Sequence, residues 1–175
     1  RAWELLFAAE PLMPHDLDAA ARLRFHRAAG NACFQTERIG DAVRHFRAAL
    51  ALTTAPIERA ATRAHIARAW VFDFATREGT REIAEAFHEL DLKLPTAEGS
   101  DASTLLARLN QMLLDAVAAV DAGLEPSTGN ELAAFKATIA LCELGFLSGY
   151  YDRNLPFAMQ CGILALVPAC RAGDS

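Results

Sequence analysis

Residues 28–50 read AAGNACFQTERIGDAVRHFRAAL, and this stretch decides the fold. Its apolar residues recur at helical spacing on both sides of a short polar turn, which predicts two antiparallel helices. Small residues let the two helices approach closely, a phenylalanine fills the space toward the next pair, and a further alanine admits the next helix. These positions are Gly30, Ala42, Phe46 and Ala49.

The same four positions resemble the spacing of a tetratricopeptide repeat. One departure is the turn, where Glu37 and Arg38 replace the usual Gly-Asp. The apolar face of the second helix recurs in residues 82–92, after about 40 residues, whereas the standard repeat has a period of ~34. We therefore expect antiparallel helical hairpins of irregular length, stacked as a tetratricopeptide-like right-handed superhelix. A plain bundle of two amphipathic helix pairs is the alternative.

Turn signals divide the rest of the chain into further helices, and no stretch alternates with period two for long enough to predict a strand. Pro56 suits a first helical turn, and Thr80 and Asn154 are expected N-caps. Thr128 and Glu131 have the spacing of a capping box. The expected helices cover residues 3–9, 16–35, 39–52, 56–75, 80–92, 102–120, 128–147 and 154–170. The predicted fold class is therefore all-α.

Residues 95–101 (PTAEGSD) form the most extended polar stretch, rich in helix breakers. We therefore expect tetratricopeptide-like hairpins over residues 1–94, a linker over residues 95–103, and further helical hairpins over residues 104–175. The chain begins at Arg1 without a methionine and stops at Ser175 in a polar turn. These ends lead us to expect a fragment that is truncated at its C-terminal end.

The charges and cysteines narrow the classes of partner. The 17 basic and 22 acidic residues give a net charge of −5, and the basic residues are scattered singly. Proteins that bind nucleic acid gather Lys and Arg on one face, so we expect no nucleic acid as partner. The four cysteines form no C-x-x-C pair, which predicts reduced, buried thiols instead of disulfides.

The sequence also shapes our expectation of location. We recognise no signal peptide at the N-terminus. The most apolar run, residues 157–170, is shorter than the ~20 residues of a membrane-spanning helix. We therefore expect a cytoplasmic location without membrane contact.

Motifs for catalysis and metal binding are missing. Neither the phosphate-binding G-x-x-x-x-G-K-(S/T) and G-x-G-x-x-G patterns nor the nucleophile pattern G-x-S-x-G occurs. The histidines form no H-x-x-x-H or H-E-x-x-H, and His26 with Cys33 would supply only two ligands. Residues 88–90 (HEL) resemble the start of a histidine-kinase phosphoacceptor box, but residues 91–93 (DLK) replace its Arg-Thr-Pro. We therefore expect no enzyme, no cofactor and no metal.

The first full helix carries candidate binding residues on the face that lines the concave groove of tetratricopeptide stacks. An Arg with an Asn one turn later can hold a peptide carboxylate. The corresponding positions of the next long helix are apolar, so this clamp is incomplete and the wall suits packing against another helix. The candidate groove residues are Arg24, Arg27, Asn31, Phe34, Gln35 and Phe74.

Three passages resemble a family of large multidomain signalling proteins. Residues 52–60 (LTTAPIERA) resemble its small-residue, Thr-Pro-Leu-Glu-Arg-Ala link between repeats, and residues 89–95 (ELDLKLP) resemble its Leu-rich helix ending in Leu-Pro. Residues 150–158 (YYDRNLPFA) are similar to an Ala-Tyr, Asp-Pro-Asn-Leu-Phe-Ala signature, with the proline displaced to position 156. That signature opens a helix ending in a Gly-Asn-Ser turn, which here reads GDS at residues 173–175.

The family joins a protein-kinase-like domain, a STAND/AAA-type ATPase, a long helical repeat, a GAF domain and a sensor histidine kinase. The resemblance is to the helical repeat, so it implies no catalytic residue in this chain. It implies a non-catalytic regulatory segment of a signal-transduction ATPase/kinase, whose partners are intramolecular modules or another protein. The alternatives are a free-standing adaptor that binds peptide tails, and a helical domain that senses a ligand near Tyr150 and Tyr151.

Overall fold

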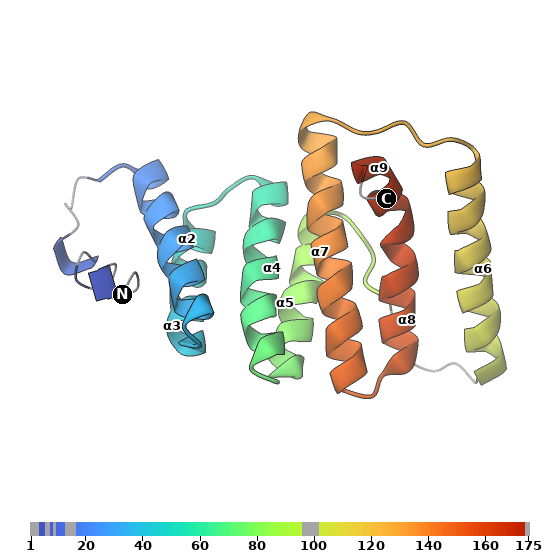
Figure 1. Cartoon of the computed structure of the whole chain (residues 1–175), viewed down its shortest axis with the longest axis horizontal. Coiled ribbons are helices and arrows are strands. Elements are labelled where there is room, and N and C mark those ends of the chain that lie inside the picture. Colours follow the sequence, from blue (N-terminus) through green and yellow to red (C-terminus); the bar gives the residue numbers. More distant parts are fainter. Residues whose placement is uncertain (1–3, 6–7, 9, 13–16, 96–101, 174–175) are drawn as a thin grey trace.

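The computed structural model of the chain describes residues 4–5, 8, 10–12, 17–95 and 102–173, and over these ranges it is all-helical, without a β-strand (Figure 1). The predicted all-α class is therefore confirmed. The expected helix at residues 3–9 and the expected linker lie largely outside these ranges. The elements are η1 (Glu10–Leu12, a 3-10 helix), α2 (Ala19–Gln35), α3 (Ile39–Ala51), α4 (Pro56–Phe72), α5 (Thr76–Glu89), α6 (Ala102–Asp121), α7 (Gly129–Tyr151), α8 (Leu155–Leu164) and α9 (Leu166–Ala172).

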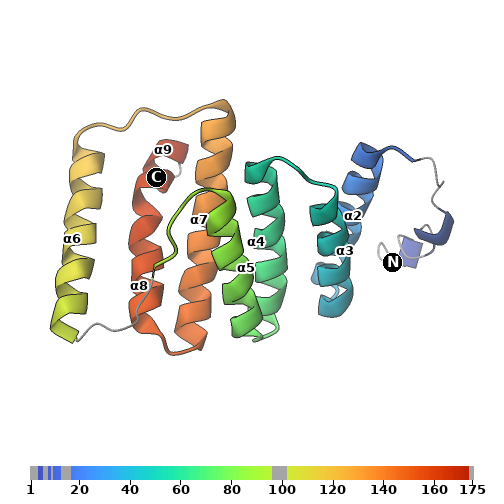
Figure 2. The same ribbon diagram turned by 180° about the vertical axis from the view of Figure 1, so that it is seen from behind.

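The described helices form a row of antiparallel hairpins, α2 with α3, α4 with α5, and α7 with α8 (Figures 1 and 2). The first helices of these pairs, α2, α4 and α7, run in the same direction (Figure 1). Helix α6 precedes α7 in the chain but packs beyond it, against α8 and α9 at the far end of the row. As a result, α7 takes the place directly beside α4 and α5.

The first hairpin packs as its sequence predicts. A Cβ atom at Gly30 would lie 2.6 Å from Cε1 of Phe46, so a side chain there would push α2 and α3 apart. The Phe46 ring continues to the second hairpin, where it stacks on the His65 ring of α4 with 5.2 Å between centroids. Ala42 and Ala49 are completely buried. The phenylalanine therefore fills the space between hairpins, as expected.

The boundary between α4 and α5 lies earlier than predicted. Helix α4 ends at Phe72 and α5 begins at Thr76, whereas the sequence suggested residues 75 and 80. The chain turns at Phe74, whose φ of 59° lies in the left-handed region that a bulky residue rarely adopts. Thr80 lies inside α5, so the N-cap predicted there is wrong. Helix α5 also ends at Glu89 instead of residue 92.

The last predicted helix is two helices in the structure. Pro168 has no N–H to donate to the carbonyl of Leu164, and its ring crowds that carbonyl, so the helix breaks at Ala165. The predicted cap at Asn154 is confirmed, because its Oδ1 accepts a hydrogen bond from the Phe157 N–H at 3.3 Å.

Helix α7 differs from its prediction at both ends. The predicted capping box is wrong, because the Thr128 side chain makes no cap hydrogen bond and Glu131 forms an ion pair with Arg171 at 3.1 Å. At its other end α7 continues to Tyr151 instead of stopping near residue 147. This additional turn carries the hydrogen bonds of Ser148 to α5.

Polar groups fix α7 against the second hairpin. The Ser148 side chain is completely buried, and its Oγ donates to the carbonyl of Thr76 at 3.3 Å. The hydroxyl of Thr80 lies 2.8 Å from the same Oγ, which accepts its hydrogen bond. Thr76 Oγ1 in turn donates to Oδ1 of Asp152 at 2.7 Å. These bonds set the register of α7 along α5.

Glycines allow α8 to cross α7 closely. A Cβ atom at Gly149 would lie 2.9 Å from the backbone N of Ala158 and 3.0 Å from the carbonyl O of Asn154. At Gly145 it would lie 2.6 Å from Sγ of Cys161. The two helices are therefore in near-backbone contact at the end of α7.

The cysteines are packing residues. All four are free, and Cys33, Cys142 and Cys161 are buried, which confirms the prediction of reduced thiols. Burial raises the pKa of Cys142 and of Cys161 to about 12. Both thiols are therefore protonated at neutral pH and unsuited to act as nucleophiles.

Two stretches, Gly129–Tyr151 and Leu155–Ala172, are long and apolar enough to cross a membrane by length and composition. The second stretch has 18 residues and is therefore longer than residues 157–170, the run identified from the sequence. Its helix breaks at Ala165. A core helix of a water-soluble protein can have the same length and composition. Helix α7 packs against α4, α5, α8 and α9, as a core helix does.

Replacing Gly149 by alanine should destabilise the fold. The nearest atoms are backbone atoms of α8 that cannot move aside without shifting the helix, so we expect a loss of about 1–3 kcal/mol in the free energy of unfolding. Gly162→Ala is the matched control, because its Cβ would meet only Cδ2 of Phe146 at 3.8 Å. Urea unfolding measures both variants. Gly162→Ala should equal or exceed the wild type in stability, and a Gly149→Ala variant of wild-type stability would contradict the close crossing.

Candidate functional site

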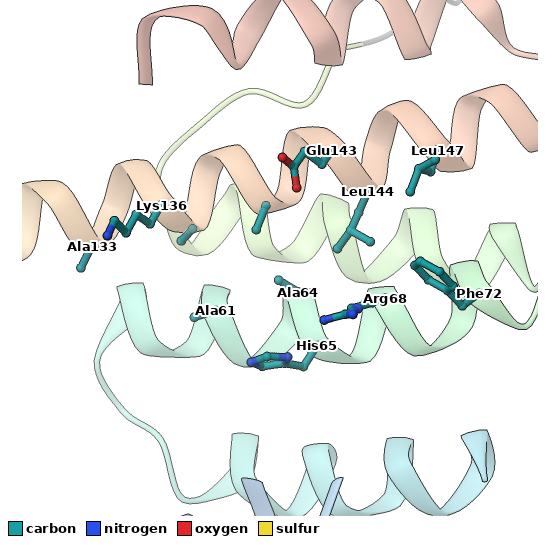
Figure 3. Close-up of a pocket in the computed structure, with 12 residues that line it drawn as sticks. Ala61, Ala64, His65, Arg68, Phe72, Ala133, Lys136, Glu143, Leu144 and Leu147 are labelled. Atoms are coloured by element: carbon teal, nitrogen blue, oxygen red, sulfur yellow. The ribbon is translucent and has the colours of Figure 1, made fainter. Parts of the chain in front are cut away.

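A groove with a volume of about 680 Å³ lies between α4 and α7 (Figure 3). We call it the α4–α7 groove. Its residues follow one another in the same order on both helices, from Ala61 and Ala133 at one end to Phe72 and Leu147 at the other (Figure 3). Most of the lining is alanine, leucine and phenylalanine. The polar side chains are His65, Arg68, Lys136 and Glu143.

Alanines keep the groove open. Ala61 and Ala64 of α4 lie across from Ala137 and Ala140 of α7, and their methyl groups leave space that larger side chains would fill. The seating of α7 on α5 by Ser148 holds this alanine stripe opposite α4. The groove is thus a consequence of where α7 packs.

Arg68 is the best-positioned cation of the groove. Its Cζ lies 4.7 Å from the ring centroid of Phe34 in α2 and 5.8 Å from that of Phe72. The two rings meet edge to face at 5.8 Å. Within the described part of the chain, no carboxylate forms an ion pair with Arg68. Its charge therefore remains available to a ligand at the groove.

The opposite wall contributes both signs of charge. Lys136 and Glu143 are exposed on α7 and lie along the groove (Figure 3). The two cations, Arg68 and Lys136, stand on different walls, with apolar surface between them. Such an arrangement suits an elongated ligand with an apolar face and carboxylates at its flanks.

His65 lies under the groove as a neutral group. It stacks almost parallel on Phe46, with 16° between the ring planes. Burial lowers the pKa of His65 below its ordinary value of 6.5, and the positive charges of Arg68 and Arg27 lower it further. At neutral pH the imidazole is therefore uncharged and joins the groove to the core of the first hairpin.

The residues predicted for the groove on α2 are partly engaged with α4. Nη2 of Arg27 pairs with Oε2 of Glu58 at 3.3 Å and donates to Oγ1 of Thr62 at 3.4 Å. Arg27 therefore links two hairpins, which limits its use as a clamp for a ligand carboxylate. Arg24 and Asn31 are exposed on α2.

The structure brings Phe34 and Gln35 together with Phe72 but leaves Phe74 elsewhere. Phe34, Gln35 and Phe72 line a second hollow of about 520 Å³. The Phe74 ring instead packs on Tyr151 at the end of α7, with 5.3 Å between centroids. The early end of α4 explains this difference, because the chain turns away at Phe74 and Phe72 takes the position beside Phe34.

Sequence reasoning missed the whole α7 wall of the groove. Lys136, Glu143 and Leu147 lie far along the chain from α4, with α6 between them. The available signal was the helical spacing of small residues at 133, 137 and 140, which matches the alanines at 61 and 64. A pair of alanine stripes indicates helices that face each other across little side-chain volume.

The groove has the chemistry of a binding surface. Its described lining contains no serine, threonine or cysteine that could act as a nucleophile, and His65 with Glu143 gives too few ligands for a metal ion. Comparison of the chain with known protein families, with curated proteins and with solved structures gives no match.

Lower pH should destabilise the fold in part through His65. The unfolded chain takes up this proton first once the pH falls below about 6.5, because the folded state holds the pKa of His65 lower. The free energy of unfolding should therefore decrease from that pH downward. His65→Phe keeps an aromatic ring on Phe46 and removes the titrating group.

Urea unfolding between roughly pH 7.5 and pH 5 measures this contribution. His65→Phe should lose less stability over the interval than the wild type. His88→Gln, on an exposed position of α5, is the control and should follow the wild type. Equal pH dependence in the wild type and His65→Phe would contradict a neutral, half-buried His65.

Proposed function

We propose that the chain is a non-catalytic helical-repeat module that binds an amphipathic helix of a protein partner along the α4–α7 groove. The observation that carries this proposal is the apolar groove with Arg68 and Lys136 on opposite walls. In this proposal the hairpins form a tetratricopeptide-like, right-handed superhelix. The common direction of α2, α4 and α7 supports it, because consecutive repeats place their first helices side by side on one face.

The size of the groove supports a helical ligand. The lining of α7 runs from residue 133 to residue 147, about 21 Å at 1.5 Å per residue, which matches roughly four turns of a helix. The alanine floor accepts leucine or phenylalanine side chains, and helix-in-groove recognition uses such anchors at i, i+3, i+4 and i+7. Carboxylates beside this stripe would meet Arg68 and Lys136.

We further propose that the module regulates a multidomain signalling ATPase/kinase in the cytoplasm. The passages at residues 52–60, 89–95 and 150–158, which resemble that family, support this context. In the structure the first passage joins α3 to α4 and the third joins α7 to α8, so both lie where hairpins connect. A partner helix from another domain of the same protein would hold that protein inactive until a signal displaces it.

Filling the groove should weaken helix binding. Ala133 is exposed and lines one end of the groove, so Ala133→Trp obstructs it without disturbing the core. We expect affinity to fall about tenfold or more, equivalent to ~1.4 kcal/mol. Ala118→Trp, on an exposed position of α6, is the matched control and should bind as the wild type does.

The probe is a labelled amphipathic peptide of about 18 residues with a leucine stripe flanked by glutamates, and fluorescence anisotropy measures its binding. A second peptide carries lysine in place of glutamate and should bind more weakly. Failure of both peptides to bind the wild type, or equal binding by Ala133→Trp, would overturn the proposed binding site.

The regulatory role has its own test in the full-length protein. Ala133→Trp should raise basal ATPase or kinase activity, because it releases the helix held in the groove. Ala118→Trp should leave that activity unchanged. Unaltered basal activity in Ala133→Trp, together with lost peptide binding, would contradict regulation while leaving the binding module intact.

A further inference from the structure

We propose that Glu10, His26 and His45 form a binding site for a divalent transition-metal ion of the zinc class. The three residues come from η1, α2 and α3, at the end of the row opposite α6. One potential ligand atom from each lies within 4.8 Å of the others. This site is separate from the α4–α7 groove and does not depend on the proposed binding of a helix.

The two imidazoles already have the spacing of ligands on one metal. Nδ1 of His26 lies 3.1 Å from Nδ1 of His45. Two nitrogens bound tetrahedrally to zinc at 2.0–2.1 Å would lie about 3.3 Å apart. His45 is 1% exposed, and Phe25 packs edge-on against both imidazoles. The pair is thus held in place by its surroundings.

Glu10 supplies an anionic ligand, which at present holds Arg44. Nη1 and Nη2 of Arg44 lie 2.8 and 3.2 Å from the two carboxylate oxygens of Glu10. Nη2 also lies 3.1 Å from Nε2 of His45. The Glu10 carboxylate and Nε2 of His45 therefore already surround a cation, whereas Nδ1 of His45 faces His26.

A metal ion would compete with Arg44 for these acceptors. The Arg44 side chain is half exposed, and its Nε lies 3.9 Å from Oδ1 of Asp41. Asp41 gives the guanidinium another carboxylate to pair with once the metal holds Glu10. Removing the Arg44 charge should therefore strengthen metal binding.

Ligand types decide which metals fit. Two imidazoles and one carboxylate suit Zn²⁺ and its neighbours in the transition series, whereas Ca²⁺ and Mg²⁺ prefer oxygen ligands throughout. Three protein ligands leave a further position for water. Because the ligands come from η1 and from both helices of the first hairpin, the bound ion would fasten η1 onto α2 and α3.

Titration of the complete chain with Zn²⁺, followed by calorimetry, and with Co²⁺, followed by visible absorption, tests the proposal. We expect one ion per chain. Loss of a residue that hydrogen-bonds to a metal ligand typically weakens metal binding roughly 10–100-fold. His26→Gln and Glu10→Gln each remove a ligand itself, so each should weaken Zn²⁺ binding by more than this. Arg44→Gln should strengthen binding. His88→Gln, far from the cluster on exposed α5 surface, should bind as the wild type does.

The outcomes are distinguishable from a failure to fold. His26 and Glu10 are only partly buried, and the thermal unfolding of each metal-free variant shows whether it still folds. Absence of stoichiometric binding to the wild type would overturn the proposal without any variant. Equal weakening by His88→Gln and His26→Gln would also overturn it, because the ion would then bind scattered surface histidines. In that case the two imidazoles are hydrogen-bonded to each other, with one Nδ1–H donating to the other Nδ1, and they bind no metal.

Discussion

This structure depends on close contact between helices at glycine residues, where the absence of a Cβ atom lets two helices approach. At Gly30 the ring of Phe46 occupies the space that a side chain would need. At Gly149 the two nearest atoms are backbone atoms of Ala158 in α8 and of its N-cap Asn154. The first hairpin is therefore closed by a ring with some freedom to adjust, and the last hairpin is closed by main chain without that freedom.

The place of α7 follows from its buried polar group as much as from its apolar surface. A helix that is apolar on most sides can pack against many neighbours, so hydrophobic burial alone does not select one register. Ser148, by contrast, needs partners, because a buried hydroxyl without a hydrogen bond costs about 1–3 kcal/mol. Thr76 and Thr80 of α5 provide them. The register that satisfies Ser148 also sets Ala137 and Ala140 opposite α4, and the groove results.

Several features fixed by neighbouring residues could be predicted from the sequence, although the caps at Thr80 and Thr128 were wrong, and features fixed by distant contacts could not. The first hairpin, the Pro56 start and the Asn154 cap each depend on a few consecutive positions, and the structure has them. The left-handed turn at Phe74, closed by backbone hydrogen bonds to Val71 and Trp70, runs against the preference of a bulky residue, so the end of α4 was misplaced. The α7 wall of the groove could not be predicted from the sequence. Helix α6 comes between α4 and α7 in the chain but packs against α8 and α9, so α7 and not α6 lies beside α4. Glu10 joins His26 and His45 only in three dimensions, although the two histidines lie at similar distances from the hairpin turn.

In a row of hairpins each unit contacts mainly its neighbours, so the first hairpin influences the groove chiefly through α4. Two aromatic contacts provide that route. Phe34 of α2 lies under Arg68, so the main cation of the groove is positioned by a ring from the first hairpin. Phe46 of α3 stacks on His65, so the base of the groove rests on the same hairpin. An ion that fastens η1 to α2 and α3 would therefore act on the groove by steadying these rings, without touching any residue that lines it.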